Sequence, residues 1–350
     1  MKKDIYLNEL KKLEKDMEQI KNTPYVMYSK VVTLVTMNMR YEKVAFASHL
    51  KEHPFILTSG IIKDASLQFA ALLDASFIES ADRRAKGFKS LAKEKKHKEL
   101  FDEVWNRYGK KDYEEYVKRY IYRIDVNHIE GLIRGKKCVD MGCGNGNFCI
   151  ALLRRGASLA AGVDYGAKSI AYAKKAAREL SLDKRSIFKC ATVYKTGLRG
   201  DTFDFAIQNG VFHHLNNEDR AIAETVRIMK RGGWLWYYTD GEGGISYDLW
   251  DKSVYLLRKT SVLFIENILK SMNVKRNKTV HIMDGLSATY AHTSWNKITR
   301  KLSSFGFGNF KRLTGGFDTD CDLDRIKSDP YGRAKFGEGD LRVLCQLVEK

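Results

Sequence analysis

Short apolar runs and amphipathic stretches alternate along the second part of the chain, from Cys138 to Val348. Apolar runs of about four to eight residues predict buried strands, and apolar residues repeating every three or four positions predict helices. Strands are predicted to end at Met141 and Asp164, to begin at Phe203, and to span 186–191, 234–238, 310–313 and 341–348; helices are predicted over 147–155, 167–180, 217–229 and 294–304. This alternation predicts a mostly parallel α/β sheet whose strands are joined by right-handed crossovers.

The first part of the chain carries mainly the spacing of helices. A helix is predicted over 4–21, a mixed apolar stretch follows over 25–51, and Thr58 or Ser59 is placed to cap a third helix. Aromatic residues at helical spacing recur in 101–108 and 113–128, which favours core helices over a base-stacking platform. We therefore predict a mainly helical N-terminal region over 1–130, ahead of a second domain over 131–350.

Two segments of that second domain, 239–293 and 315–340, are longer than the alternating pattern needs. Each follows the carboxyl end of a predicted parallel strand, the edge at which open α/β sheets bind ligands. We expect both inserts to build a ligand pocket, with 249–272 as one or two covering helices. The side chains expected to line this pocket are Trp250, His281, Tyr290, His292 and Arg333.

The clearest chemistry lies in Asp140-Met141-Gly142-Cys143-Gly144-Asn145-Gly146, where a predicted strand turns into a helix. Glycines take positive φ and lack a Cβ, so a ligand can lie against the backbone, at the free N–H groups of the helix. The spacing G-x-G-x-G differs from the G-x-G-x-x-G of dinucleotide-binding loops. Asp140 would repel a pyrophosphate but attract a ligand with ammonium and sulfonium groups, which favours S-adenosylmethionine over NAD.

Three further stretches with recognisable patterns follow this glycine turn along the chain. They are Gly162-Val163-Asp164, the strand and loop Phe203–Leu215, and the helix end, Gly-Gly turn and strand Ile228–Trp236. Together the four stretches resemble those of class I S-adenosylmethionine-dependent methyltransferases, over about residues 131–348. The resemblance implies a Rossmann-like, mostly parallel seven-stranded sheet with an antiparallel last strand, and S-adenosylmethionine as the cofactor. It also implies that the helical region over 1–130 covers the cofactor cleft.

The resemblance also implies where the parts of the cofactor lie: the methionine along the glycine turn, the ribose at the second strand, and the sulfonium near the fourth. Many relatives have an acid after the third strand that accepts the adenine amino group. Here that position is Ala191, so the contact is expected to fall to Thr192 or to backbone. The expected cofactor-binding residues are Asp140, Gly142, Gly144, Gly146, Asp164, Tyr165, Thr192, Gln208 and Asn209.

Methyl transfer from a sulfonium needs an aligned acceptor, and a base where the acceptor is an alcohol, a phenol or a protonated amine. His213 and His214 are candidate bases. Because a similar His-His-Leu ending accompanies varied acceptors in relatives, a role in packing or in fixing the loop is favoured over the base role. His281 and Tyr290 are further catalytic candidates, with a surface-loop role as the alternative. Asp329-Pro330-Tyr331 resembles an amino-methylating motif but has one proline and follows the sixth strand, so we discount it.

Lys and Arg number 61 against 43 Asp and Glu, a net charge of +18. Such a field draws anionic partners, including metabolites and nucleic acid, although a proteome-wide bias gives the same composition. The run 83–98 is strongly basic and is read as a solvated face or linker. No run approaches 18 apolar residues, so no membrane span is expected.

The six cysteines show no metal-ligand spacing, and no metal site is predicted. Cys138, Cys190 and Cys345 lie in apolar strands and are interpreted as core thiols. Reduced thiols fit a cytoplasmic setting.

These observations predict S-adenosylmethionine-dependent methyl transfer, by in-line displacement, to a small anionic metabolite or a sugar unit. The alternative is a tRNA or rRNA methyltransferase that grips phosphates with its basic N-terminal helices. The chain shows no RNA-binding domain signature, which favours the small molecule. An NAD-dependent oxidoreductase is disfavoured by the glycine spacing and by Asp140, and a non-catalytic cofactor-binding module by the long inserts. The sequence indicates no oligomeric state.

Overall fold

The computed structural model describes residues 2–74, 110–275, 278–279, 282–283, 285 and 291–350, and the chain divides into two compact units. The helical unit is drawn from 1–93, 243–287 and 326–337, and the sheet unit from 94–242, 288–325 and 338–350. Helix α5 (Lys110–Val126) thus belongs with the sheet, and residues of both predicted inserts belong with the N-terminal helices. The predicted boundary at residue 130 stays a prediction.

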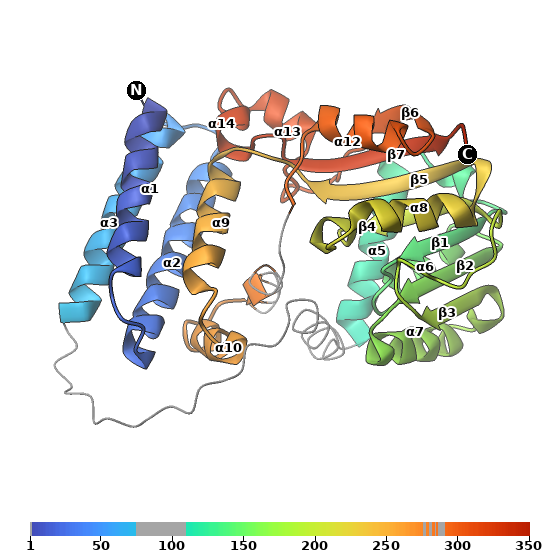
Figure 1. The fold of residues 1–350 in the computed structure, drawn as a ribbon, viewed down its shortest axis with the longest axis horizontal. Coiled ribbons are helices and arrows are strands. Elements are labelled where there is room, and N and C mark those ends of the chain that lie inside the picture. The colour runs from blue at the N-terminus through green and yellow to red at the C-terminus, as the bar shows by residue number, and fades with distance from the viewer. Residues whose placement is uncertain (1, 75–109, 276–277, 280–281, 284, 286–290) are drawn as a thin grey trace. The chain divides into compact units, whose positions relative to one another are not determined.

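The sheet unit is built on seven strands in the order β3-β2-β1-β4-β5-β7-β6 (Figure 1). Strands β1 to β5 pair in parallel, and β7 runs antiparallel to both β5 and β6. The strands are β1 (Lys137–Met141), β2 (Leu159–Asp164), β3 (Ser186–Cys190), β4 (Phe203–Asn209), β5 (Met229–Asp240), β6 (Phe307–Arg312) and β7 (Asp340–Leu347). The predicted Rossmann-like sheet, with its antiparallel last strand, is confirmed.

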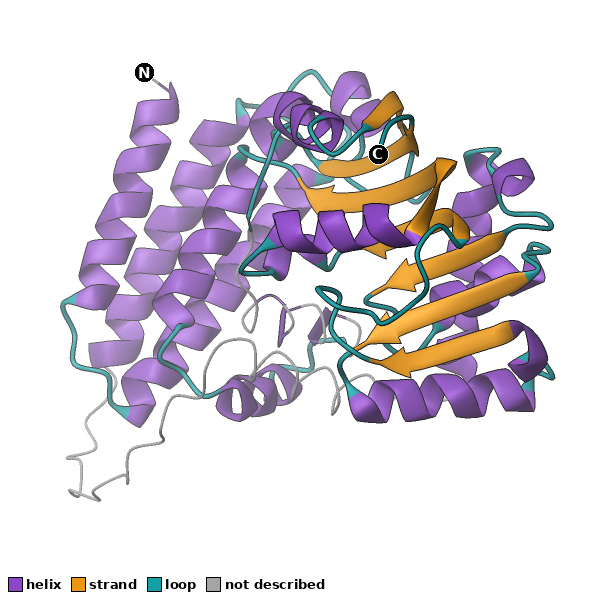
Figure 2. Cartoon of the chain, turned by 45° about the vertical axis from the view of Figure 1, so that its right-hand side comes forward, coloured by secondary structure: helices purple, strands orange, loops and turns teal. Residues whose placement is uncertain are grey.

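Helices cover both faces of this sheet (Figure 2). On one face α5, α6 (Asn147–Arg154) and α7 (Ala167–Glu179) contribute to a buried cluster around Phe148 and Trp236. On the other, α8 (Glu218–Ile228) and α12 (Trp295–Ser303) pack through Ile222 and Ile298. Both faces of the central strands are therefore buried, as the apolar runs predicted. Short 3-10 turns η2 (Glu130–Leu132), η3 (Asp183–Arg185) and η4 (Phe212–His214) lie between these elements.

Three local predictions were wrong. Strand β5 begins at Met229, before the glycine pair, and its pairing with β4 shifts register between Phe203 and Phe205. The segment that contains Gly232, at φ 81°, is therefore an irregularity within the strand and not a turn before it. Thr58 and Ser59 do not cap a helix, since α3 begins at Pro54 and both hydroxyls donate to carbonyls one turn back. Cys190 is exposed because it ends β3, the edge strand of the sheet.

The helical unit contains α1 (Lys2–Glu18), α2 (Pro24–Ala45), α3 (Pro54–Asp74), α9 (Ile245–Leu257), α10 (Val262–Ser271) and α14 (Gly332–Phe336), while α13 (Leu323–Ser328) lies where the chain passes between the units. Its segments are tied by buried polar contacts, among them Lys335 Nζ, which donates to Asp329 at 2.6 Å. Helix α3 has the length and mean hydropathy, 1.3, of a membrane span, and 33% of that window is buried. The expectation of no membrane span stays a prediction.

Candidate active site

The glycine turn after β1 has the predicted conformation, but its three glycines are needed for three different reasons. Gly142, Gly144 and Gly146 have φ values of 93°, 50° and 82°. A Cβ on Gly142 would lie 2.6 Å from a Val211 methyl, and one on Gly146 would lie 2.8 Å from the Phe188 ring. A Cβ on Gly144 would meet nothing within 4 Å. Only Gly144 therefore faces open space where a ligand can lie, while the other two allow close packing.

Asp164 ends β2 beside this turn, as predicted. Its Oδ2 accepts the backbone N–H of Gly144 at 2.9 Å, and its Oδ1 accepts that of Gly166 at 2.8 Å. The turn is also tied to β2 through its backbone, because the Gly142 and Cys143 amides donate to Val163 O. The carboxylate is only partly buried, so it stands at the rim of the turn, where it can meet a ligand's hydroxyl groups.

Asp140 lies at the end of β1 with 3% of its surface exposed. Burial, and then the charge of nearby Asp164, raise the pKa of its carboxyl to about 8. Among the residues described by the structure, no lysine or arginine pairs with it. The Oδ1 atom of Asn147, the first residue of α6, is also buried and lacks a hydrogen-bond partner among the described residues. The turn thus holds two buried acceptors that suit a cationic donor.

Helix α5 contacts the same turn. Tyr113 Oη donates to the Asn145 carbonyl at 3.4 Å, and the Tyr120 ring stacks on Phe148, with 4.3 Å between the ring centroids. The pKa of the Tyr120 hydroxyl is raised to about 12, mainly by burial and to a smaller extent by the negative charge of Asp140. The predicted helix over 113–128 therefore lies against the glycine turn, within the sheet unit.

The two residues expected near the sulfonium have local partners. Gln208 is fully buried; its Nε2 donates to Tyr238 O at 2.7 Å, and its Oε1 accepts the amides of Val211 and Phe212. It thereby fixes the loop after β4. Asn209, half-buried, accepts the Trp236 indole N–H at 3.3 Å. Their roles toward a cofactor stay predictions.

On the adenine side, Tyr165 is 38% exposed directly after Asp164. Ala191 follows β3, and Thr192 is exposed, with its carbonyl accepting the Lys195 amide. These residues lie at the same edge of the sheet as the glycine turn, because β1, β2 and β3 are parallel neighbours.

His213 and His214 lie in η4, directly after β4, with ring centroids 4.0 Å apart. His213 is 5% exposed, and its Nε2 lies 3.9 Å from Asp240 Oδ2 at the end of β5. His281 and Tyr290, the other catalytic candidates, lie outside the described residues, as does the basic run 83–98.

The side chains expected to line the ligand pocket are divided between the two units. His292 belongs to the sheet unit, whereas Trp250 and Arg333 belong to the helical unit. Arg333 is exposed and donates to Gly337 O at 3.3 Å. A single cavity lined by all these residues stays a prediction.

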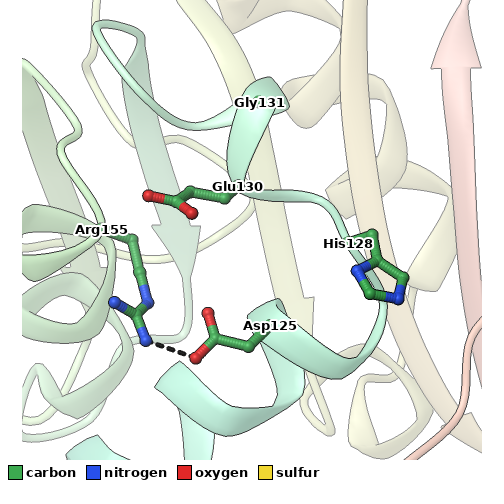
Figure 3. A pocket seen from close by; sticks show the side chains of 5 residues that line it. All are labelled: Asp125, His128, Glu130, Gly131 and Arg155. Atoms are coloured by element: carbon green, nitrogen blue, oxygen red, sulfur yellow. Dashed lines mark hydrogen bonds and ion pairs between the residues drawn. The ribbon is translucent and has the colours of Figure 1, made fainter.

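A cavity of about 470 Å³ lies elsewhere in the sheet unit (Figure 3). It is lined by Asp125, His128, Glu130, Gly131 and Arg155, with Arg155 paired to Asp125. Arg155 follows the carboxyl end of α6, whose amino end is at the glycine turn, so a helix of about 12 Å separates the two. This cavity is therefore not the site formed by the turn.

Sequence patterns missed three residues of the site: Tyr113 and Asn147 at the turn, and Asp240 beside the histidines. Tyr113 was assigned only to an apolar stripe, and Asn147 only to a helix start. Asp240 was missed because strand five was expected to end at Tyr238; extending it by two residues would have placed an acid at the ligand-binding edge.

Comparison with known proteins agrees with this geometry. Residues 139–237 match the methyltransferase domain family. Ubiquinone biosynthesis O-methyltransferase of Bartonella bacilliformis is 26% identical over 176 residues, covering 47% of this chain and 68% of that protein. The mitochondrial enzyme of the same name from Rattus norvegicus is 29% identical over 137 residues, covering 38% of this chain and 39% of that protein. The chain therefore spans well under half the length of the rat relative.

Among solved structures, geranyl diphosphate C-methyltransferase from Streptomyces coelicolor A3(2) is similar with a TM-score of 0.43 and 16% identity, over 76% of this chain and 88% of that one. The family match over 139–237 and the sequence relatives confirm the predicted resemblance to class I S-adenosylmethionine-dependent methyltransferases. The cofactor predicted from the glycine turn, S-adenosylmethionine, is thereby confirmed.

The residues at the turn fit this cofactor. Its ammonium group suits the buried Asp140 carboxyl and the Asn147 oxygen, and the open space beside Gly144 admits a chain against the backbone. These features are all in the sheet unit.

Proposed function

We propose that this chain transfers the methyl group of S-adenosylmethionine to a hydroxyl oxygen of a small anionic metabolite or sugar unit. The observation that carries the proposal is the His213 imidazole beside the Asp240 carboxyl at the ends of β4 and β5. A hydroxyl acceptor must lose a proton as its oxygen attacks, and an imidazole is the side chain best suited to accept one near neutral pH. The relatives named as O-methyltransferases support the same kind of acceptor atom.

The cofactor supplies a methyl group already activated on a sulfonium. Within the chain, Asp140 and Asn147 hold the ammonium end, Gly144 gives it room, and Asp164 accepts hydrogen bonds from the ribose hydroxyls. Tyr165 and Thr192 flank the adenine. Gln208 holds the loop after β4 so that Asn209 and His213 face the reacting groups. The protein's contribution is alignment and removal of the acceptor proton.

The net charge of +18 supports an anionic acceptor, but it would also support RNA. Incubation with methyl-labelled cofactor and cell extract separates the two. We expect label in the low-mass fraction, resistant to nuclease. Label in a nuclease-sensitive polymer would contradict the small-molecule proposal.

Salt gives an independent check. An RNA gripped through several phosphates loses affinity by about 0.7 log units per contact for each tenfold rise in salt. A small acceptor held by one or two buried pairs should show a shallow dependence. A steep slope for total RNA, together with methyl transfer to it, would reverse the ranking.

A further inference from the structure

Asp240 is the centre of a polar cluster at the ends of β4 and β5 that no sequence pattern indicated. Its side chain is 17% exposed. His213 Nε2 lies 3.9 Å from its Oδ2, and Tyr238 Oη donates to its Oδ1 at 3.2 Å. His214 and His292 are close enough for their charge to act on the Asp240 carboxyl. One imidazole is thus at ion-pair distance from the Asp240 carboxyl, and two more are near enough to affect its charge.

The backbone holds these groups together from distant parts of the chain. The amide of Ala291 donates to His213 O at 3.1 Å, and the amide of Thr293 donates to Asp240 O at 3.2 Å. Residues 291–293 therefore bind both the loop after β4 and the end of β5, and they carry His292 to the cluster. Such cross-connection fixes the imidazoles relative to the carboxyl before any ligand binds.

A second carboxyl determines the charge of the cluster. The Tyr238 hydroxyl lies 3.2 Å from Asp240 Oδ1 and 3.4 Å from Asp340 Oδ1, and its one proton can serve only one of them. Asp340 is already paired with Arg342 at 3.2 Å. Burial and the Asp340 charge raise the pKa of Asp240, while His292 and His214 oppose that rise. Asp240 is therefore the carboxyl whose charge depends on the imidazoles.

We propose that Asp240 is a positioning residue for proton removal: it orients the His213 imidazole and balances the imidazolium that forms there. This rests on the proposed function, transfer to a hydroxyl. The acceptor O–H proton moves to His213, the oxygen lone pair forms the O–CH3 bond, and the S–CH3 electron pair stays on sulfur. Positive charge passes from sulfur to the imidazole, where Asp240 offsets it.

The position of His213 fits this step. A Cβ on Gly210, directly after β4, would lie 3.3 Å from the Tyr238 ring and 4.0 Å from His213 Cε1. The imidazole thus lies at the carboxyl end of the strand, where α/β sheets bind substrates. An imidazolium formed there lies at ion-pair distance from the Asp240 carboxylate. Because both groups are largely buried, the attraction between them is stronger than it would be in water.

The test compares Asp240→Asn with Asp204→Asn, a matched change at the other end of the same strand pair, where Asp204 binds Lys230 at 2.8 Å. Imidazole titrations of both variants are followed by NMR. Methyl transfer is measured against pH with 3,4-dihydroxybenzoate, an anionic phenol, as the probe. Circular dichroism and S-adenosylhomocysteine affinity establish that each variant folds and binds cofactor.

Asp240→Asn is expected to lower the His213 pKa by about one unit, because the opposite charge is lost. It should reduce kcat about ten- to a hundredfold with little change in KM. A loss of this size is part of the rate increase of about 10²–10⁴-fold that a general base contributes. Asp240→Glu should recover much of the His213 pKa. Asp204→Asn should change neither quantity.

Failure of this inference can be distinguished from failure of the proposed function. If the native chain methylates the probe and Asp240→Asn leaves the His213 titration and the pH profile unchanged, Asp240 has no such role and the proposed function stands. If the native chain methylates neither the probe nor any hydroxyl compound in extract, the proposed function fails and this inference fails with it.

Discussion

The backbone N–H of Gly144 donates a 2.9 Å hydrogen bond to the carboxylate of Asp164, so the glycine turn and the end of β2 form one rigid corner. The acid at the end of β2 therefore has a structural role, support of the glycine turn, that does not depend on a ligand. It also separates two roles of Asp164, since Oδ2 supports the turn while the partly exposed carboxylate can accept hydrogen bonds from a ribose.

Asp164→Ala should weaken cofactor binding by about 1–3 kcal/mol, or about ten- to a hundredfold, because two ribose hydroxyls and the Gly144 amide lose an acceptor. Calorimetry with S-adenosylhomocysteine measures the change. Asp183→Ala, at an exposed position before β3, is the control and should bind normally. Unchanged affinity of Asp164→Ala would remove the ribose assignment.

Gly144→Val and Gly146→Ala should fail in different ways. Gly144 has open space beside it, so its valine variant should fold, with about 1–2 kcal/mol of strain from positive φ, yet fail to bind cofactor. The added Cβ of Gly146→Ala meets Phe188 and Ala173 within 3.0 Å, so that variant should lose about 1–3 kcal/mol of stability. Thermal unfolding and calorimetry together separate the two. Normal binding by Gly144→Val means that the ligand lies elsewhere.

Cofactor affinity should depend on pH through Asp140, whose pKa of about 8 falls when an ammonium group binds beside it. Binding needs the ionised carboxyl, so affinity should rise by up to tenfold per pH unit between about pH 6 and 8. Above that, the ligand's own α-ammonium, with a pKa of about 8, begins to lose its proton and affinity falls. Asp140→Asn should abolish the rise. A flat profile for the native chain would refute the pairing with Asp140.

Asp320→Asn should destabilise the sheet unit strongly. Asp320 Oδ1 accepts from Arg123 at 2.8 Å and from Arg342 at 2.9 Å, and all three side chains are less than 10% exposed. Removing the carboxylate leaves buried guanidinium groups uncompensated, which costs about 3–5 kcal/mol. Urea unfolding followed by tryptophan fluorescence measures it. Asp201→Asn, at a 73% exposed partner of Lys350, should change stability by less than about 0.5 kcal/mol. A similar loss of stability in both variants would show that the buried Asp320 carboxylate is no more important for stability than an exposed one.

The sequence by itself determined the sheet, the glycine turn and the cofactor. Those features are local: alternating apolar periods, three glycines at fixed spacing, and acids at two strand ends. It could not show that Gly142 and Gly146 serve packing, because Val211 and Phe188 approach them from distant positions. The same limit made Cys190 look buried, since an apolar run does not reveal that its strand is at the edge of the sheet.

Only the tertiary structure brought Asp240, His213 and His292 together. They come from the end of β5, the loop after β4 and residues 291–293, and hydrogen bonds between backbones hold them in place. It also divided the long inserts between two compact units, a division that depends on contacts among residues far apart in sequence. Local periodicity records which face of an element is buried, but proximity between elements depends on how the whole chain packs, and no single stretch contains that information.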